Sequence, residues 1–257
     1  SEEPCSLVLR FCEKLSCETH KKNDRAILHD FSSLNSVSMQ ATRILAIRHG
    51  ETPWNVDTRI QGQLDIGLND TGKWQAQRVG QALREEQIAA IYSSDLARAF
   101  ETAQAIAQNH VFAAQLSVIA HTGLRERHFG HLQGQTWAEI ESGWPQDAKL
   151  WRGRDPHWSP VGGESLTVVR ERIAGCVNEL ARQHIGQQIV LVAHGGVMDA
   201  LYRLATNQAV QAPRTWHLGN AAINRLLWTP QGLSLVGWGD VSHFDDADDA
   251  PRDETTT

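Results

Sequence analysis

The sequence predicts an α/β fold, a three-layer sandwich with a mostly parallel central sheet covered by helices on both faces. Short apolar runs typical of buried strands alternate with longer segments of helical periodicity. The runs at 43–47 and 189–193 are almost wholly apolar, as strands of parallel sheets are. The chain of 257 residues is long enough for one such domain with a sizeable core.

The expected elements follow one another from residue 43 to residue 238. Polar residues at 69–71 and 93–95 resemble the N-caps of the first two helices, and a turn at 230–232 joins the last two strands. In order, the sequence predicts strands at 43–47, 89–92, 115–119, 189–193, 222–227 and 233–238, with helices at 71–86, 95–109, 165–184 and 196–205.

The two ends of the chain differ from this body. Residues 1–38 show no sustained periodicity, so we expect a poorly ordered N-terminal extension, with a short helix around 5–15 as the alternative for part of it. The domain is expected to span 39–240. The segment 241–257 holds six acidic residues against Arg252 alone, which predicts an acidic, disordered tail.

Charge and composition exclude several classes of partner. The formal net charge is −6, but nearly all of it lies in the tail, and residues 39–240 hold equal numbers of acids and bases. A nucleic-acid-binding protein needs a basic face, so we expect no nucleic acid partner. No run approaches the roughly 18 apolar residues of a membrane span, so we expect no membrane partner. The four cysteines include no Cys-x-x-Cys pair and no secretory signal is evident, which favours reduced thiols in a cytoplasmic protein.

Polar residues suited to phosphate binding follow three of the predicted strands. Arg48 and His49 follow the first strand, Arg98 lies just beyond the second, and His194 follows the most apolar one. Ligands of open α/β sheets bind beyond the carboxyl ends of strands, so we expect these four side chains to converge. A single histidine after a strand is more commonly structural; the combination is what indicates a site for a phosphoryl group.

Each of these residues has a chemical role in that interpretation. A neutral His49 is a good nucleophile near pH 7 and can carry the phosphoryl group, and its other ring nitrogen should donate to a backbone carbonyl. Arg48 and Arg98 carry planar guanidinium groups, whose paired N–H donors match the oxygens of a phosphoryl group. His194, if protonated, adds a donor where charge develops. Because side chains supply the cations, we expect no metal and no cofactor.

Two further groups complete this interpretation. Gly50, Gly195 and Gly196 would let backbone amides approach the phosphate closely. The leaving alkoxide needs a proton, and Glu126, between Arg125 and Arg127, is the candidate acid. A solvated charged loop is the alternative for that segment.

At this point the sequence resembles a known family, the histidine phosphatase superfamily of phosphoglycerate-mutase-like proteins. The resemblance covers residues 42–240 and neither end of the chain. The matching segments are RILAIRHGETPWN (43–55), TRIQGQLDIGLNDTGKWQA (58–76), IYSSDLARAFETA (91–103), LRERHFGHLQGQTWAEI (124–140), VGGES (161–165) and VLVAHGGVMDAL (190–201).

The resemblance implies that His49 is the phosphorylated nucleophile, that Arg48, Arg98 and His194 complete the phosphate pocket, and that Glu126 is the proton donor. It also implies a set of substrate-contacting positions beyond these: Asn55, Gln61, Gly62, Gly195 and, less directly, Asn220.

The family contains phosphatases and mutases, and the sequence favours the phosphatase branch. The stretch between Phe129 and Gly162 lacks the longer insertion and the lysine of cofactor-dependent mutases, and Gln61-Gly62 is similar to the phosphatase branch. Gly67, where relatives often have proline, is a departure that loosens a loop. We therefore expect a metal-independent phosphomonoester phosphatase that acts on a small phosphorylated metabolite. The alternatives are a phosphoglycerate mutase and a non-catalytic phosphate-ligand-binding relative.

Substrate and assembly are less constrained by the sequence. The cationic residues Arg125, Arg127, His128, Arg152 and Arg154 could form a second anion site, with a solvated lid as the alternative. Trp54, Trp137 and Trp151 could surround the mouth of the site, although ordinary packing is the simpler expectation. A homodimer is a candidate assembly, since nine tryptophans could include some at a subunit interface.

Overall fold

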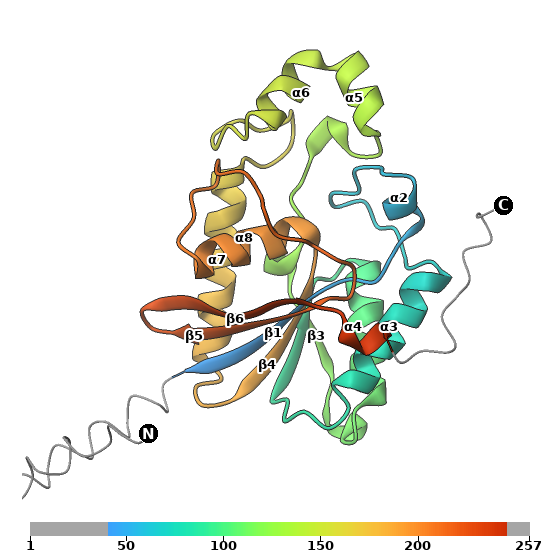
Figure 1. The fold of residues 1–257 in the computed structure, drawn as a ribbon, viewed down its shortest axis with the longest axis vertical. Helices are drawn as coiled ribbons and strands as arrows, with labels where there is room; N and C mark the ends of the chain where they lie inside the picture. Colours follow the sequence, from blue (N-terminus) through green and yellow to red (C-terminus); the bar gives the residue numbers. More distant parts are fainter. Residues whose placement is uncertain (1–40, 246–257) are drawn as a thin grey trace, which may run out of the picture. The chain divides into compact units, whose positions relative to one another are not determined.

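The computed structural model describes residues 41–245, which form a six-stranded sheet flanked by helices (Figure 1). The predictions for residues 1–38 and for the tail beyond Asp245 lie outside the described residues. The strands are β1 (Thr42–Arg48), β2 (Ala90–Ser93), β3 (Val118–Ala120), β4 (Gln188–Ala193), β5 (Ile223–Thr229) and β6 (Gly232–Asp240). The helices are α2 (Pro53–Val56), α3 (Asp70–Ala82), α4 (Ala97–Asn109), α5 (Trp137–Gly143), α6 (Pro145–Arg152), α7 (Leu166–Arg182) and α8 (Gly195–Ala205).

The sheet has the strand order β3-β2-β4-β1-β5-β6. Strands β1, β2, β3 and β4 are parallel to one another, whereas β5 runs antiparallel to its neighbour β1 and forms a hairpin with β6. The sheet is therefore mixed, with a parallel centre, and the predicted α/β fold class is confirmed. Because β1 and β4 are neighbours, the residues that follow them are brought together at one edge of the sheet.

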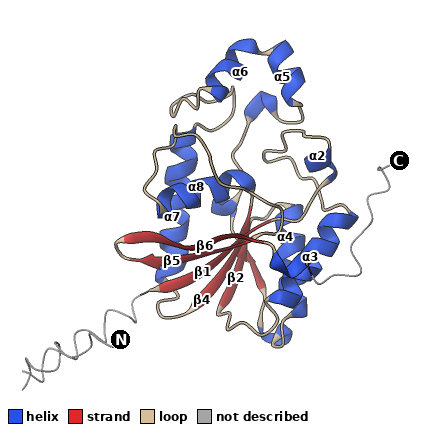
Figure 2. Cartoon of the chain, viewed as in Figure 1, coloured by secondary structure: helices blue, strands red, loops and turns tan. Residues whose placement is uncertain are grey.

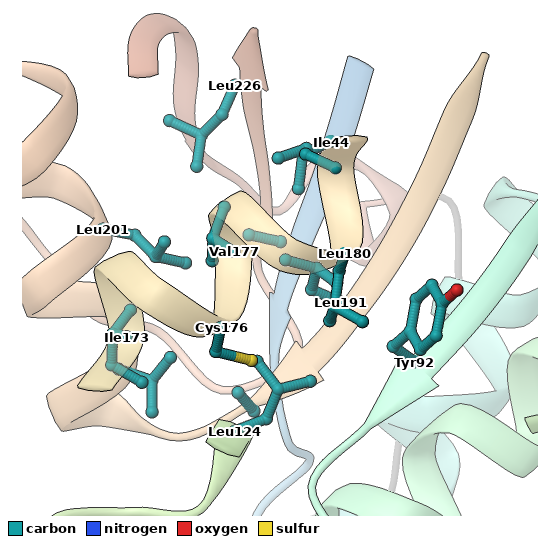
Figure 3. Packing of buried hydrophobic residues seen from close by; sticks show 14 of the residues in the cluster. Ile44, Tyr92, Leu124, Ile173, Cys176, Val177, Leu180, Leu191, Leu201 and Leu226 are labelled. Carbon is teal, nitrogen blue, oxygen red and sulfur yellow. The ribbon is translucent and has the colours of Figure 1, made fainter. Parts of the chain in front are cut away.

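Alternate residues of the strands supply two hydrophobic cores, one on each face of the sheet. Ile44 and Ala46 of β1 pack toward α7 and α8, while Leu45 and Ile47 pack toward α3 and α4. Figure 2 shows the sheet between these helix pairs. Figure 3 shows the first core, where side chains of α7 such as Ile173 interdigitate with those of the strands.

Helices α5 and α6 form a separate cap, which extends beyond α7 and α8 in Figure 1. Their own small core consists of Leu132, Ile140 and Ala148 with surrounding aromatic side chains. The sequence analysis predicted neither helix, because both are short. A capping box of Thr136 and Glu139 begins α5, and Pro145 begins α6.

Several predicted boundaries differ from the structure. The first long helix is capped by Asn69, as expected, but ends at Ala82. Helix α4 begins after Leu96, with no side-chain cap from 93–95; the Asp65 carboxylate instead accepts the N–H of Ala97 at 2.7 Å. Residues 242–244, predicted to belong to the disordered tail, form a 3-10 turn that packs against α3.

Within residues 41–245, no helix combines the length and the apolarity that a bilayer-spanning segment requires.

Candidate active site

His49 lies just past the end of β1 and is buried, with 3% of its surface exposed. Its Nδ1 lies 2.7 Å from the carbonyl oxygen of Gly50, so Nδ1 carries the proton and donates to that oxygen. The expected hydrogen bond to a backbone carbonyl is confirmed. It leaves the lone pair of Nε2 available as a nucleophile.

The surroundings of His49 keep its ring neutral. Burial lowers the pKa of His49 well below its ordinary value, and the positive charges of Arg48 and Arg98 lower it further. The hydrogen bond to Gly50 opposes this shift without outweighing it. The imidazole is therefore in its nucleophilic form at neutral pH.

His194 follows β4 and its ring centroid lies 5.3 Å from that of His49. Both ring nitrogens of His194 are buried without a hydrogen-bond partner among the described residues. Burial, then the charge of Arg98, lowers its pKa well below the ordinary value. The sequence analysis expected a donor if the ring were protonated; here the ring is neutral and offers one N–H.

Arg48, at the end of β1, is anchored by a hydrogen bond from Nη1 to the carbonyl of Leu218. Its Nε is buried without a partner among residues 41–245. Burial lowers its pKa, Glu126 raises it, and Arg214 lowers it. Since guanidinium groups ordinarily titrate above about 12, Arg48 remains a cation with an unused donor.

Arg98, in the first turn of α4, is almost completely buried. Its Nη2 donates to the carbonyl of Gly62 at 2.7 Å and its Nη1 to that of Leu64 at 2.9 Å, which holds the fork in place. The Nε has no partner in the described part of the chain. Burial lowers the pKa of Arg98 to about 10, so it too stays charged at neutral pH.

The Glu126 carboxylate is positioned by two backbone amides. Oε1 accepts the N–H of Arg127 at 2.6 Å, and Oε2 accepts the N–H of Gly196 at 2.9 Å at the start of α8. Glu126 also acts electrostatically on Arg48 and Arg98. The structure thus brings the predicted acid to the same place as the two predicted arginines.

The loops around this centre hold most of the other predicted residues. The Asn220 amide donates to the carbonyl of His49 at 2.9 Å and to Oδ1 of Asn55 at 3.3 Å, so both asparagines lie beside the nucleophile. Gln61 is buried and its Oε1 lacks a partner among the described residues. Gly62 acts through its carbonyl, which holds Arg98.

The predicted glycines have different roles. Gly195 lines the cavity described below, as expected. Gly196 lines it too, but its amide donates to Glu126 Oε2 at 2.9 Å, and the Gly50 amide donates to the Thr102 hydroxyl at 3.0 Å, so neither of these two amides is free to bind phosphate. A Cβ at Gly50 would lie 2.4 Å from the carbonyl oxygen of Gly72, so this glycine permits close backbone packing instead.

A cavity of about 430 Å³ begins at this centre and extends to the cap. Of the five residues predicted as a second anion site, only Arg127 and Arg154 line it. Arg125 is paired with Asp95, and Arg152 with Glu141. Trp151 also lines the cavity. Trp137 contacts Trp151 edge to face, and Trp54 lies near Gly134, so these two serve packing.

Sequence reasoning missed four residues that shape this site. Glu164 lies in the matched segment VGGES but carried no assigned role; with Arg172 it holds the backbone around Glu126. Arg214 lines the cavity from a loop without any motif. Gln63 donates to the Glu126 carbonyl at 3.0 Å, and its only signal was its place beside Gln61-Gly62.

In the part of the chain that the structure describes, no three His, Cys, Asp or Glu side chains gather as a metal site would require.

Comparisons with known proteins agree with this geometry. The profile described as "Histidine phosphatase superfamily (branch 1)" matches residues 44–241. The chain is 39% identical over 218 residues to the phosphoglycerate mutase-like protein 4 of Arabidopsis thaliana, which covers 84% of this chain and 92% of the relative. It is 37% identical over 210 residues to the metal-independent phosphoserine phosphatase of the same plant, over 81% of this chain and 85% of the relative.

Solved structures give the same result. The structure of mycobacterial glucosyl-3-phosphoglycerate phosphatase matches with a TM-score of 0.69 and 36% identity, covering 77% of this chain and 99% of the other. The matched residues 44–241 include every residue of the centre described above. The resemblance stated from the motifs is confirmed, and the chain belongs to the histidine phosphatase superfamily.

Proposed function

We propose that this protein is a phosphatase that hydrolyses small phosphate monoesters through transient phosphorylation of His49. The observation that carries this proposal is the hydrogen bond from His49 Nδ1 to Gly50, which directs the Nε2 lone pair to the reaction. Around it, Arg48, Arg98 and His194 each retain a buried nitrogen without a partner among the described residues. Buried donors of this kind are costly unless an anion binds them.

In the first step, Nε2 of His49 attacks phosphorus and the bond between phosphorus and the ester oxygen breaks. The leaving oxygen takes a proton from Glu126 in its protonated form, so that a neutral alcohol departs. Arg48 and Arg98 neutralise the charge on the transferred oxygens. Since these cations come from side chains, the step needs no metal ion.

In the second step, water attacks the phosphorus of phosphohistidine and the N–P bond breaks. The Glu126 carboxylate accepts a proton from the water, which restores the acid for the next cycle. Inorganic phosphate leaves and His49 is again neutral. Glu126 is held by the amides of Arg127 and Gly196 in a position to serve both steps.

Transfer to water is favoured over transfer to a second substrate. The segment 130–160 forms only the small cap of α5 and α6 with its connecting loops, and Gly195 and Gly196 line the cavity beneath it. Two of the relatives reported above are named as phosphatases. The substrates in their names, phosphoserine and glucosyl-3-phosphoglycerate, support a small phosphorylated metabolite as the substrate here.

Trapping of the phosphorylated protein tests whether a phosphohistidine forms at His49. Brief incubation with a ³²P-labelled monoester should label the wild-type protein, with a label that is stable to base and labile to acid. His49→Ala should carry no label and should lose hydrolysis of p-nitrophenyl phosphate. His157→Ala, at an exposed position, is the matched control and should retain both. Equal hydrolysis by wild type and His49→Ala would overturn the mechanism.

The same purified protein distinguishes a phosphatase from a mutase and from a non-catalytic relative. A mutase would convert 3-phosphoglycerate to 2-phosphoglycerate and would be stimulated by 2,3-bisphosphoglycerate, whereas a phosphatase releases inorganic phosphate without it. A non-catalytic relative would bind phosphate esters but release none from any monoester.

A further inference from the structure

Two peptide groups lie next to the nucleophile, one before Gly50 and one after it. The group after Gly50 supplies the carbonyl that accepts the proton of His49 Nδ1 at 2.7 Å. The N–H of that same peptide group belongs to Glu51, and it donates to Oε1 of Gln75 at 2.8 Å. A continuous chain of hydrogen bonds therefore runs from the His49 ring, through one peptide group, to a side chain of α3.

The peptide group before Gly50 is held by other side chains. Its carbonyl, which belongs to His49, accepts the Asn220 amide at 2.9 Å. Its N–H, which belongs to Gly50, donates to the Thr102 hydroxyl at 3.0 Å. Neither contact reaches the Gly50 carbonyl, because that carbonyl belongs to the next peptide group. The side chain that binds this next group, and so bears on the acceptor of the His49 proton, is Gln75.

The start of α3 is fixed against this segment by close contacts. Asn69, the N-cap of the helix, donates its backbone N–H to the Glu51 carbonyl at 3.1 Å and its side-chain amide to the Glu51 carboxylate at 2.9 Å. A Cβ at Gly72 would lie 2.0 Å from the carbonyl oxygen of Glu51, so the two backbones touch directly. Gln75 follows Gly72 by three residues and therefore lies on the same face of the helix, where its oxygen reaches the Glu51 N–H.

This chain of hydrogen bonds acts on the charge of the ring. When Nε2 bonds to phosphorus while Nδ1 keeps its proton, the imidazole becomes positively charged. Burial lowers the pKa of His49 most strongly, whereas the hydrogen bond to Gly50 raises it, so the carbonyl favours the positive ring. A carbonyl is a stronger acceptor when the N–H of its own peptide group is hydrogen-bonded, because bonds in a chain polarise one another.

We infer that Gln75 is a positioning residue for the nucleophile, whose amide oxygen orients and polarises the peptide group that holds the His49 ring. The inference rests on the proposed function, since it gives Gln75 a part in the phosphorylation of His49. Gln75 does not line the cavity and acts only through the peptide group. Because it stabilises the positively charged phosphohistidine, it promotes formation of the N–P bond and opposes its cleavage.

The first chemical step is tested with Gln75→Leu, which removes the acceptor oxygen. For p-nitrophenyl phosphate, kcat/KM reports the steps up to phosphorylation of His49 and requires no proton from Glu126. It should fall roughly fivefold, which corresponds to about 1 kcal/mol, the net contribution of a typical hydrogen bond. Gln75→Glu keeps an acceptor oxygen at the same position and should retain the wild-type value. An equal loss in Gln75→Glu would overturn the inference.

The second chemical step is measured from the decay of the phosphoenzyme. Protein labelled with ³²P at His49 is chased with unlabelled p-nitrophenyl phosphate and quenched in base, and the loss of label gives the rate of hydrolysis. In Gln75→Leu this rate should equal or exceed the wild-type rate, because the ring loses its positive charge as the N–P bond breaks. A purely structural role would slow both steps together. That result, or an unchanged kcat/KM in Gln75→Leu, would refute the role assigned to Gln75.

A second glutamine of α3 provides the matched control. Oε1 of Gln77 accepts the Asn109 side-chain amide at 2.7 Å, so Gln77→Leu loses the same kind of hydrogen bond in a place that does not reach His49. It should keep the wild-type rates of both steps. Gln75→Met keeps the length of the side chain without the amide, and it gives the same measurement if Gln75→Leu does not fold.

The resonance of the Nδ1 proton separates failure of this inference from failure of the proposed function. In protein with ¹⁵N-labelled histidine, the resonance that His49→Ala removes is assigned to this proton. A weaker hydrogen bond moves such a proton upfield, so Gln75→Leu should shift the resonance upfield and Gln77→Leu should not. If the wild type hydrolyses no monoester, the proposed function fails, and an unchanged resonance in Gln75→Leu still decides against the inference.

Discussion

The Arg172 guanidinium binds the Glu164 carboxylate through two hydrogen bonds, from Nε to Oε1 at 2.8 Å and from Nη2 to Oε2 at 2.9 Å. The same guanidinium donates to three carbonyls within residues 123–126, and Glu164 Oε2 accepts the N–H of His128 at 2.8 Å. The pair therefore holds the backbone on both sides of Glu126. We interpret Arg172 and Glu164 as positioning residues for the general acid.

Arg172→Gln should impair hydrolysis according to the leaving group. We expect kcat for glycerol 3-phosphate to fall roughly 10-fold or more, part of the 10²–10⁴-fold that a positioned acid contributes. For p-nitrophenyl phosphate the loss should be smaller, because p-nitrophenolate leaves without a proton. Steady-state kinetics on both esters gives the ratio. Arg182→Gln, exposed near the end of α7, is the control. Equal losses on both esters would indicate a purely structural role.

Gly196→Ala should displace the same carboxylate by direct contact. A Cβ at Gly196 would lie 2.2 Å from Oε1 of Glu126, and its nearest neighbours are all atoms of that side chain. The Glu126 side chain must therefore move to make room for it. We expect a large loss of kcat with a small change in Tm, measured by kinetics and thermal unfolding. Gly175→Ala, in α7 with nothing within 4 Å, should keep full activity and stabilise the fold by about 0.5–1 kcal/mol. Full activity in Gly196→Ala would contradict the position assigned to Glu126.

Acidification should destabilise the fold through the buried histidines. His49 and His194 have pKa values well below the ordinary value, so below about pH 6.5 the unfolded chain binds protons that the folded chain does not. Stability therefore falls as the pH decreases, by up to about 1.4 kcal/mol per pH unit for each such histidine. His194→Gln should flatten the dependence of unfolding free energy on pH between about 5 and 6.5. His157→Gln, at an exposed position, should leave the slope unchanged. Parallel curves for wild type and His194→Gln would refute this expectation.

The fold and the centre could be predicted because both depend on local patterns. Apolar runs identify strands, and residues that directly follow parallel strands meet at one edge of the sheet. This rule places His49 and His194 together without knowledge of any other contact. The bond from His49 to Gly50 was also foreseeable, since the two residues are adjacent.

The features of the site that the sequence did not predict depend on long-range contacts, which leave no local pattern in the sequence. Asp65 caps α4 from a loop more than 30 residues earlier, so the local cap signal was wrong. Arg127 and Arg125 are equivalent in the sequence, yet one is buried in the cavity and the other is paired with Asp95. Arg214 belongs to a loop without periodicity or motif. Only the folded chain distinguishes such residues.

The cap has its own hydrophobic core, centred on Leu132, Ile140 and Ala148 and separate from the two cores of the sheet. Substitutions in the cap can therefore reshape the wall that faces the leaving alcohol without disturbing the packing that holds the nucleophile. The cap side of the cavity and the catalytic centre therefore rest on different hydrophobic cores. During evolution, this separation lets the cap change toward other phosphate esters while the residues that transfer the phosphoryl group stay the same.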